Sequence, residues 1–410
     1  MNPSPKQDEA LRAVGEWLSS NPTQPFYLAG YAGTGKTTLA SHFAEGVSGR
    51  VYFAAYTNKA AHVLRQKGCT TARTIHSLIY LPRGKDFRGY EAIERRVAEL
   101  SLVPAEQLPD KEVIELSTLR RELEKLNEEL KSPAFHLNTD SELRGASLLI
   151  VDECSMIDRN MGEDLLSFQV PILVLGDPAQ LPPVRGTGYF TSREPDYLLT
   201  EIHRQAKDNP ILHIADLVRR GERVPPGQYG DSVVTRKIKV VDALDQADQI
   251  LVGTNKTRRY INAQGRSHLL KASNSLPMER DRLVCLQNNM ELGLMNGSLW
   301  RVGQVGECDD MVCSLRVDSD DGLGSVWVRA LRAFFEGREQ ELQYYEMGMG
   351  HKFDYGYALT VHKAQGSQWD RVVVLDEASK FPDRGDFARQ WRYTAVTRAA
   401  KRLDYVVKEG

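Results

Sequence analysis

The chain has 410 residues, of which 41% are hydrophobic and 26% charged, an ordinary composition for a soluble globular protein with two or more domains. Its 53 basic and 55 acidic residues give a formal net charge of -2, so nucleic acid would have to bind in a local groove and not on a generally basic surface. Five cysteines without a C-x-x-C pair argue against a disulfide framework, and Cys308 and Cys313 lack nearby partners for a zinc site. We expect reduced thiols, a cytosolic setting, and neither a signal peptide nor a membrane span.

The first predicted element is a short buried strand at residues 26–29, followed by the octapeptide GYAGTGKT at residues 30–37. The octapeptide fits the phosphate-loop pattern G-x-x-x-x-G-K-[ST]. Its glycines let the loop wrap around phosphate oxygens, and a helix that starts near Lys36 adds the positive end of its dipole. The context predicts a nucleoside triphosphate, with Lys36 at the β- and γ-phosphates and the Thr37 hydroxyl on magnesium.

Short apolar runs recur along the rest of the chain, with helical stretches between most of them. They cover residues 51–57, 147–151, 171–175, 248–252, 371–375 and 402–407. This alternation predicts an α/β fold with parallel sheets.

Two segments interrupt the alternation. Residues 87–131 are highly charged, with apolar residues mostly three or four positions apart, which predicts two amphipathic helices paired as a hairpin. Residues 277–345 carry short strands and turn residues such as Asn296-Gly297, which predicts a small SH3-like β-barrel. We therefore expect one α/β domain over residues 1–190 with an insertion at 80–144, and another over 191–410 with a β-rich insertion at 277–345.

A second chemical motif is an apolar strand that ends in two carboxylates, Asp152 and Glu153. In a phosphate-loop enzyme, Asp152 would hold magnesium through its water shell, while Glu153 would orient and deprotonate the attacking water. Asp376 and Glu377 also follow an apolar run, and we interpret them as a solvated strand end. The earlier pair is preferred because the unusual string LVLGDPAQLPPV follows at 173–184, where Gln180 is well placed to read the γ-phosphate or its water.

The order of these motifs resembles that of superfamily 1 helicases, specifically the RecD-like branch, over nearly the whole chain. The strings that resemble helicase motifs are GYAGTGKTT (30–38), YTNKAAHVL (56–64), TIHSLI (74–79), IVDECSM (150–156), LGDPAQLPPV (175–184), LTEIHRQ (199–205), VGTNKTRRYIN (252–262), ALTVHKAQGSQWDRVVV (358–374) and YTAVTRAAKRL (393–403). One position departs from the family: Gln368 stands after Gly-Ser where motif V commonly has an acidic residue, so the contact to the nucleotide sugar is expected to be weaker.

The resemblance implies two RecA-like parallel-sheet domains, each carrying an insertion, that bind ATP and Mg²⁺ in the cleft between them. Arg398 and Arg204 would then be arginine fingers that reach the transferring phosphate. Gln7 resembles the family's adenine-reading glutamine, because a side-chain amide can both donate and accept on the adenine edge. The further residues assigned to nucleotide binding are Gly33, Thr34, Gly35, Thr38 and Gly366.

The expected DNA contacts come from loops on the opposite face of the two sheets, where short polar or basic side chains suit the sugar-phosphate backbone. They are Thr57, Asn58, Lys59, Thr74, His76, Ser77, Thr360, His362 and Lys363. A lone histidine is more often an internal, hydrogen-bonded residue than a ligand. His76 and His362 could therefore each be internal residues and not DNA contacts.

These features together predict an ATP-dependent DNA helicase that translocates 5′-to-3′ on single-stranded DNA and unwinds duplex or fork DNA. We expect a monomer in the cytoplasm of a bacterial cell or a phage-infected host, with replication or repair proteins as partners. One alternative is a DNA-stimulated ATPase or remodelling subunit that does not separate strands, in which case the helices at 87–131 would be a docking surface or a solvated appendage and not a wedge. Another is a phosphate-loop phosphotransferase for small molecules, which would not need a second α/β domain with its own motifs.

Overall fold

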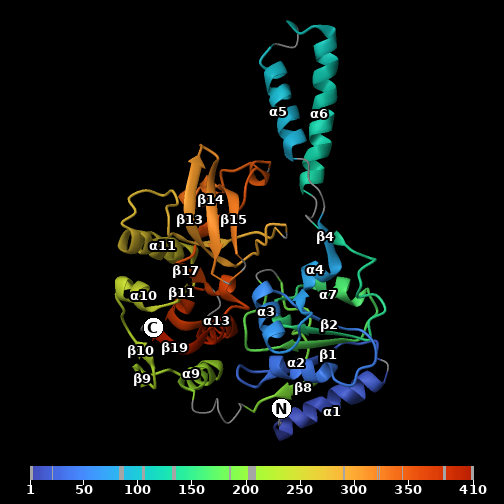
Figure 1. Ribbon diagram of the computed structural model, residues 1–410, viewed down its shortest axis with the longest axis vertical. Helices are drawn as coiled ribbons and strands as arrows, with labels where there is room; N and C mark the ends of the chain where they lie inside the picture. The colour runs from blue at the N-terminus through green and yellow to red at the C-terminus, as the bar shows by residue number, and fades with distance from the viewer. Residues whose placement is uncertain are drawn as a thin grey trace. The chain divides into compact units, whose positions relative to one another are not determined.

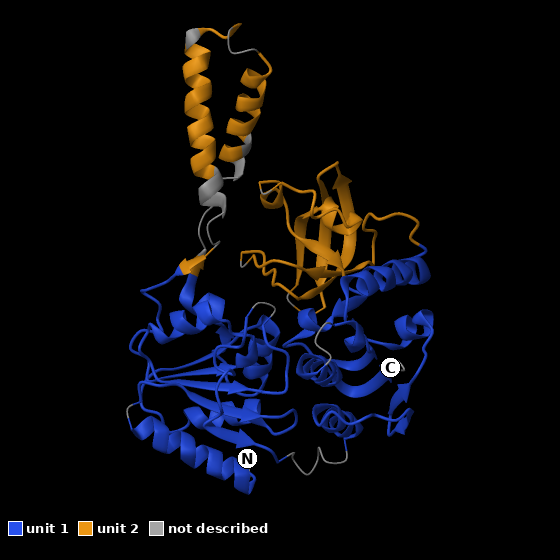
Figure 2. Cartoon of the chain, turned by 180° about the vertical axis from the view of Figure 1, so that it is seen from behind, with its two compact units in different colours: residues 1–80, 137–271, 356–410 blue, residues 81–136, 272–355 orange. Residues whose placement is uncertain are grey.

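The computed structural model describes residues 3–20, 22–82, 87–103, 107–131, 135–183, 186–201, 209–289, 291–320, 322, 324–343, 345–381 and 385–407. The chain divides into two compact units (Figure 2). The first consists of Met1–Tyr80, Leu137–Lys271 and Gly356–Gly410, and the second of Leu81–His136 and Ala272–Tyr355.

The first unit contains two largely parallel six-stranded sheets. One has the order β3-β2-β6-β7-β1-β8, and all its pairs are parallel. Its strands are β1 (Phe26–Gly30), β2 (Val51–Ala55), β3 (Arg73–Thr74), β6 (Leu148–Asp152), β7 (Ile172–Gly176) and β8 (Tyr197–Leu199). Because β8 pairs with β1, this sheet continues beyond residue 190, where the sequence suggested a domain boundary.

Helices cover both faces of this first sheet. On one face α1 (Pro5–Ser19), α2 (Lys36–Ala44) and α3 (Asn58–Gln66) bury apolar side chains against alternate strand residues such as Leu28. On the other, α4 (Ile75–Ile79) and α7 (Arg159–Leu166) pack against the intervening strand residues, together with the 3-10 turn η2 (Cys154–Met156). Burial of both faces explains why the strands are continuously apolar in sequence and lack alternation.

The other sheet of this unit has the order β17-β11-β18-β19-β10-β9, with only β9 antiparallel. Its strands are β9 (Gly227–Tyr229), β10 (Ser232–Thr235), β11 (Gln249–Val252), β17 (Ala358–Thr360), β18 (Trp369–Leu375) and β19 (Ala399–Val406). The helical segments are α9 (Pro210–Arg219), α10 (Val240–Gln246), α11 (Asn255–Leu270), η4 (Val361–Ala364), η5 (Ala378–Lys380) and α13 (Asp386–Val396). Every apolar run predicted as a strand is a strand, which confirms the α/β fold with parallel sheets.

The second unit holds a pair of helices and a five-stranded antiparallel sheet. Helices α5 (Phe87–Ser101) and α6 (Asp110–Lys131) occupy the segment for which two amphipathic helices were predicted, and they lie side by side (Figure 1). Leu100, Leu108 and Leu116 form their small core, and Arg96 pairs with Glu115 at 2.9 Å. No helix in the described part of the chain is long and apolar enough to cross a membrane.

The antiparallel sheet has the order β15-β14-β13-β12-β16. Its strands are β12 (Arg282–Cys285), β13 (Leu299–Cys308), β14 (Val312–Ser319), β15 (Ser325–Leu331) and β16 (Phe353–Tyr355), accompanied by α12 (Arg332–Glu336) and η3 (Glu346–Gly348). Its last strand therefore lies beyond residue 345, the predicted end of the β-rich segment.

The expectation that all thiols are reduced is wrong for one pair. Cys308 and Cys313 form a disulfide, with their Cα atoms 4.1 Å apart. They lie opposite each other in the β13–β14 hairpin, and this register brings the two sulfurs together. The other cysteines, Cys69, Cys154 and Cys285, are free and buried.

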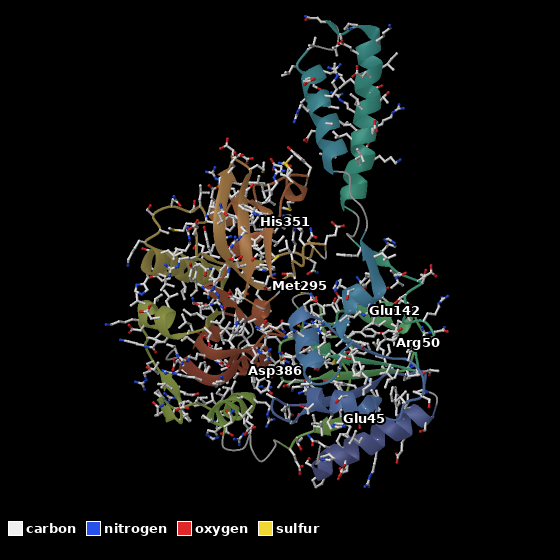
Figure 3. All side chains as sticks on the ribbon, in the orientation of Figure 1. Glu45, Arg50, Glu142, Met295, His351 and Asp386 are labelled. Carbon is white, nitrogen blue, oxygen red and sulfur yellow. A yellow bond between two sulfur atoms is a disulfide. The ribbon has the colours of Figure 1, made fainter. Side chains whose placement is uncertain are left out.

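Strands β4 (Tyr80–Pro82) and β5 (Phe135–Leu137) pair with each other at the base of the helical segment. The chain then returns to the first sheet through Glu142, which is labelled in Figure 3. Its carboxylate pairs with Arg73 at 2.5 Å and accepts a hydrogen bond from the Tyr52 hydroxyl at 3.3 Å. These contacts fix the return segment against β2 and β3.

Candidate active site

The phosphate loop connects β1 to α2. Gly33 and Gly35 have φ angles of 80° and 82°, a left-handed conformation that glycine adopts readily and other residues rarely adopt. The Lys36 ammonium lies over the loop and donates to the carbonyl oxygens of Gly30 and Tyr31 at 2.5 and 3.1 Å. The loop therefore presents its amides and the Lys36 cation at one place. The oxygens of a bound phosphate can replace these carbonyl oxygens as acceptors of the hydrogen bonds from Lys36.

The two residues predicted to hold magnesium, Thr37 and Asp152, meet beside this loop. The Thr37 hydroxyl donates to Asp152 Oδ2 at 2.8 Å, and Asp152 Oδ1 accepts from the Glu153 amide at 2.8 Å. A hydroxyl and a carboxylate oxygen at this distance fit Mg²⁺, which binds few protein ligands and completes its shell with water and phosphate oxygens.

Glu153 departs from the direction of strand β6. Its φ angle of 57° places it in the left-handed region, which is strained for a residue with a side chain and is found most often at functional sites. Burial raises the pKa of the Glu153 carboxyl, the positive charge of Arg398 opposes the rise, and Asp152 adds to it. A carboxylate with a raised pKa suits the role of a general base for water.

The segment after β7 contributes Asp177 and Gln180. Asp177 accepts from the Ala179 amide at 3.0 Å and from the Tyr393 hydroxyl at 2.7 Å; burial raises its pKa, with Lys36 opposing. The Gln180 side chain is only 8% exposed, and its Oε1 atom has no hydrogen-bond partner within the described residues. A buried acceptor without a donor is costly, and a water that attacks a phosphate would supply one.

Arg398 reaches the site from the second sheet. It is buried, with its guanidinium donating to the carbonyl oxygens of Thr394 and Ser367 at 3.0 and 3.3 Å and to the Thr397 hydroxyl at 3.2 Å. Its charge acts on both Glu153 and Asp177. The other predicted arginine finger, Arg204, lies outside the described residues.

Side chains from the second sheet also hold the segment that follows β7. The Leu181 amide donates to the Thr394 hydroxyl at 2.9 Å, and the Leu181 carbonyl accepts from Gln365 Nε2 at 2.9 Å. The Tyr393 hydroxyl accepts from the Ala32 amide of the phosphate loop at 2.8 Å while it donates to Asp177. The two sheets therefore meet through directed hydrogen bonds at the nucleotide loop.

Sequence reasoning did not single out two residues of the second sheet that contact the phosphate loop. One is Tyr393, which lies within the string YTAVTRAAKRL and so had a signal. The other is Arg219 at the end of α9, whose guanidinium lies 4.1 Å from the centroid of the Tyr31 ring. Nothing in the sequence around Arg219 pointed to this stacking contact.

Gln7 and Gly366 were both predicted to bind the nucleotide, and each contacts another part of the protein. Gln7 is buried in the capping box of α1: its Oε1 accepts from the Ser4 amide at 2.9 Å, and its Nε2 donates to the Thr34 carbonyl at 3.1 Å. It thereby supports the phosphate loop, and its reading of adenine stays a prediction. Gly366 lies against Thr57, since a Cβ atom there would come within 2.5 Å of the Thr57 hydroxyl. The role of Gly366 in nucleotide binding also stays a prediction.

The residues predicted to bind DNA lie where parallel strands end. Thr57 follows β2 and caps α3 by accepting from the Ala60 amide at 3.1 Å, and Thr74 ends β3 and caps α4 by accepting from the Ser77 amide at 3.1 Å. Thr360 ends β17 and precedes η4, which carries His362 and Lys363. The Lys59 ammonium lies 4.6 Å from the centroid of the Trp369 ring.

The two histidines of this group are half-buried, and burial lowers the pKa of each. His76 packs between the rings of Tyr56 and Tyr80, and His362 stacks on Phe387. Burial among these rings therefore disfavours the charged form of each imidazole.

The interpretation of Asp376 and Glu377 as a solvated strand end is wrong. Both are buried. Glu377 accepts from the Gly253 amide at 2.9 Å, from the Thr254 amide at 3.1 Å and from the Thr257 hydroxyl at 2.6 Å, and it pairs with Lys380. Asp376 accepts from Arg392 and the Tyr405 hydroxyl, each at 2.8 Å. These carboxylates fix the loop between β11 and α11 and the end of β18, and neither lies with the phosphate loop.

The sequence matches two protein families. Residues 3–231, more than half of the chain, match the family described as AAA domain, and residues 355–406 match the UvrD-like helicase C-terminal domain. The chain is 29% identical over 273 residues to the ATP-dependent RecD2 DNA helicase of Deinococcus radiodurans, covering 62% of this chain and 36% of that protein. It is 24% identical to the RecBCD enzyme subunit RecD of Mycobacterium tuberculosis, covering 98% of this chain and 69% of that protein.

The fold is similar to that of Pif1 helicases. A structure of Pif1 helicases at forked double-stranded DNA aligns over 100% of this chain and 93% of the other, with a TM-score of 0.53 and 17% identity. Bacteroides Pif1 bound to single-stranded DNA aligns over the same shares, with a TM-score of 0.52 and 16% identity. At these identities the similarity concerns the fold alone.

Proposed function

Because the chain belongs to the AAA-domain family and is a superfamily 1 helicase of the RecD/Pif1 type, we propose that it is an ATP-dependent DNA helicase. The chain spans 36% of the length of the RecD2 helicase and 69% of the length of the RecD subunit. The activities named for those two proteins are therefore proposals for this chain.

The observation that carries this proposal is the convergence of catalytic groups at the phosphate loop. Thr37 and Asp152 are in hydrogen-bond contact, Glu153 adjoins them, and the charge of Arg398 acts on Glu153 from the second sheet. ATP hydrolysis needs these parts: a metal site, a base for water, and a cation that stabilises the charge on the transferring phosphate.

In the proposed reaction, Lys36 and the loop amides bind the β- and γ-phosphates and hold the γ-phosphate beside Glu153. Thr37 and Asp152 would hold magnesium, which would supply positive charge to offset the charge of the phosphates. Glu153 accepts a proton from the attacking water, and Gln180 Oε1 orients that water. Arg398 stabilises the negative charge that develops on the phosphoryl oxygens, and Arg204 is proposed for the same role.

DNA binding is proposed for the strand ends that carry Thr57, Thr74 and Thr360 with their neighbours. The contacts of Tyr393, Thr394 and Gln365 with the segment that follows β7 couple the two sheets, so nucleotide binding would move one set of DNA contacts relative to the other. In the RecD-like branch such movement gives 5′-to-3′ translocation, which we propose here. A DNA-stimulated ATPase that does not separate strands is the second candidate, since it would use the same site.

The test is ATP hydrolysis by the purified protein with and without single-stranded DNA, followed by unwinding of a forked duplex. We expect DNA to stimulate hydrolysis. We expect Lys36→Ala to lower the rate by far more than tenfold, because it removes the only side-chain cation of the phosphate loop; each tenfold corresponds to about 1.4 kcal/mol of activation free energy. Hydrolysis that DNA does not stimulate would contradict the motor and favour a phosphotransferase. Stimulated hydrolysis without unwinding would favour the second candidate.

A further inference from the structure

Lys67 terminates α3 at a fixed position beside α2. Its amide donates to the carbonyl oxygens of Val63 and Leu64, each at 3.1 Å, and the Cys69 amide returns to Leu64 at 3.0 Å. Gly68 between them has a φ angle of +100°, the left-handed conformation that ends many helices. A Cβ atom on Gly68 would lie 3.9 Å from Ser41 of α2, so the end of α3 lies close to the helix that starts at the phosphate loop.

The Lys67 side chain extends toward the start of α2. Its ammonium donates to the Thr38 hydroxyl at 3.2 Å, and Thr38 directly follows the proposed magnesium ligand Thr37. The surrounding protein lowers the pKa of Lys67, while the negative charge of Asp152 opposes that effect and the positive charge of Lys36 adds to it. The ammonium is therefore within electrostatic range of both Lys36 and Asp152, and the residue keeps an exposed surface through which a ligand can reach it.

No carboxylate of the described residues forms an ion pair with Lys67, and Asp152 is already engaged by Thr37 and by the Glu153 amide. A cation held at a triphosphate site without an anionic partner is complementary to a phosphate oxygen. The Lys67 ammonium contacts Thr38, which lies one residue beyond Thr37 in α2, and among the described residues it forms no hydrogen bond with Glu153 or Asp152. This position favours a contact with a phosphate oxygen on the α2 side of the loop over a contact with the reacting γ-phosphate.

We propose that Lys67 is a nucleotide-binding residue that donates to an α- or β-phosphate oxygen, which ATP and ADP share. The inference rests on the proposed ATPase function and adds to it a contact that none of the helicase motifs contains. Lys67 contributes to affinity for the nucleotide and not to the chemical step.

The experiment measures ADP affinity by calorimetry and the kcat and KM of DNA-stimulated ATP hydrolysis. For Lys67→Ala we expect ADP affinity to fall and KM for ATP to rise by roughly tenfold, the size of one charged hydrogen bond, with kcat within about twofold of the wild type. Lys67→Arg should restore most of the affinity because the positive charge is kept. Lys239→Ala, which removes a lysine that precedes α10 in the second sheet, is the matched control and should behave as wild type. Thermal melting of each variant shows that it is folded.

Unchanged ADP affinity in Lys67→Ala, while Lys36→Ala loses it, would overturn the inference and leave the ATPase function intact. A fall in kcat without a rise in KM would also overturn it, because the amine would then act at the γ-phosphate. Equal losses in Lys67→Ala and Lys239→Ala would overturn it as well, by showing a general effect of charge. If the wild type itself bound no ADP, the proposed function on which the inference rests would fail.

Discussion

The Tyr393 hydroxyl lies 2.7 Å from the Asp177 carboxylate, to which it donates, and it accepts from the phosphate-loop amide of Ala32 at 2.8 Å. One oxygen atom of α13, the helix that precedes strand β19 of the second sheet, therefore connects the nucleotide loop with the segment that carries Gln180. Because the hydroxyl is buried, both contacts are shielded from water.

Tyr393→Phe should break this connection while the ring stays in place. Asp177 and the Ala32 amide each lose a buried hydrogen bond, so we expect the free energy of unfolding to fall by about 1–3 kcal/mol. We also expect DNA to stimulate ATP hydrolysis less in the variant, because the two sheets are less tightly coupled. Urea unfolding and ATPase assays with and without single-stranded DNA measure the two effects. Wild-type stimulation in a folded variant would show that the hydroxyl has only a structural role.

Glu153→Gln and Glu377→Gln form a matched pair of substitutions. Glu153→Gln should keep ATP and DNA binding and lower turnover strongly, because an amide cannot accept the proton of the attacking water. Glu377→Gln should keep turnover in the folded protein and lower the melting temperature, because Glu377 accepts hydrogen bonds from Gly253, Thr254, Thr257 and Lys380. If Glu377→Gln abolished turnover and Glu153→Gln did not, the two carboxylates would have been assigned the wrong way round.

The stability contributed by Glu377 should depend on pH. Burial acts to raise the pKa of Glu377, but hydrogen bonds from Lys380, Thr257 and Gly253 outweigh it, so the pKa lies below its ordinary value of 4.5. The group therefore stabilises the folded state fully above about pH 4.5, and this contribution is lost as the pH falls through the lowered pKa. Melting curves from pH 3 to 7 should show a smaller acid-induced loss of stability in Glu377→Gln than in the wild type. Parallel curves for the two proteins would contradict this.

The sequence predicted the parts of the site that adjoin a strand and a motif. Thr37 and Asp152 are 115 residues apart, but each follows a recognisable buried strand, and parallel strands bring their carboxyl ends to one edge of a sheet. Glu377 was misinterpreted because two carboxylates after an apolar run look the same whether water or protein surrounds them. Its partners Gly253 and Thr254 lie more than 120 residues away, so only the fold reveals them.

Other features depended on local geometry that spacing does not show. The pairing of Cys308 with Cys313 follows from the register of a hairpin whose strands were predicted but whose register was not. Lys67 lies between two recognisable motifs, and its approach to Thr38 depends on the end of α3 at Gln66 and on the left-handed Gly68 that follows. The order of the motifs therefore gave no indication of Lys67, which acts from the end of a helix.

The pH profile of hydrolysis should report the environment of Glu153. Burial raises the pKa of this carboxyl above its ordinary value of 4.5, and the base must be ionised to accept a proton. We expect kcat/KM for ATP to fall on the acid side with a midpoint above 4.5. In Arg398→Ala the residual activity should show a midpoint at still higher pH, because the positive charge that opposes the shift is gone. A midpoint that moved down in Arg398→Ala would contradict the contact between these charges.

The helices α5 and α6 should be dispensable for hydrolysis. Replacement of residues 88–131 by a short Gly/Ser linker removes a segment with its own small core of Leu100, Leu108 and Leu116, and none of the residues proposed for catalysis lies within it. We expect DNA-stimulated ATPase activity to remain and strand separation to decrease. Arg96→Ala, which removes the ion pairs with Glu115 and Glu99, is the control that leaves both helices present. Undiminished unwinding by the deletion variant would favour a docking surface over a wedge.

The direction of movement rests on the order in which the two sets of DNA contacts tighten. Thr57 and Thr74 lie at the ends of neighbouring strands of the first sheet, and Thr360 lies at the end of β17 in the second. When ATP binding draws Arg398 toward the γ-phosphate, one set moves relative to the other, and the set that holds more tightly during closure determines the polarity. The resemblance to the RecD-like branch predicts unwinding of a duplex that carries a 5′ single-stranded tail, with rates that fall as salt weakens the phosphate contacts. Unwinding assays on substrates with a 5′ or a 3′ tail measure this directly. Efficient unwinding from the 3′ tail and none from the 5′ tail would contradict the polarity that the resemblance to the RecD-like branch predicts, while the helicase activity stands.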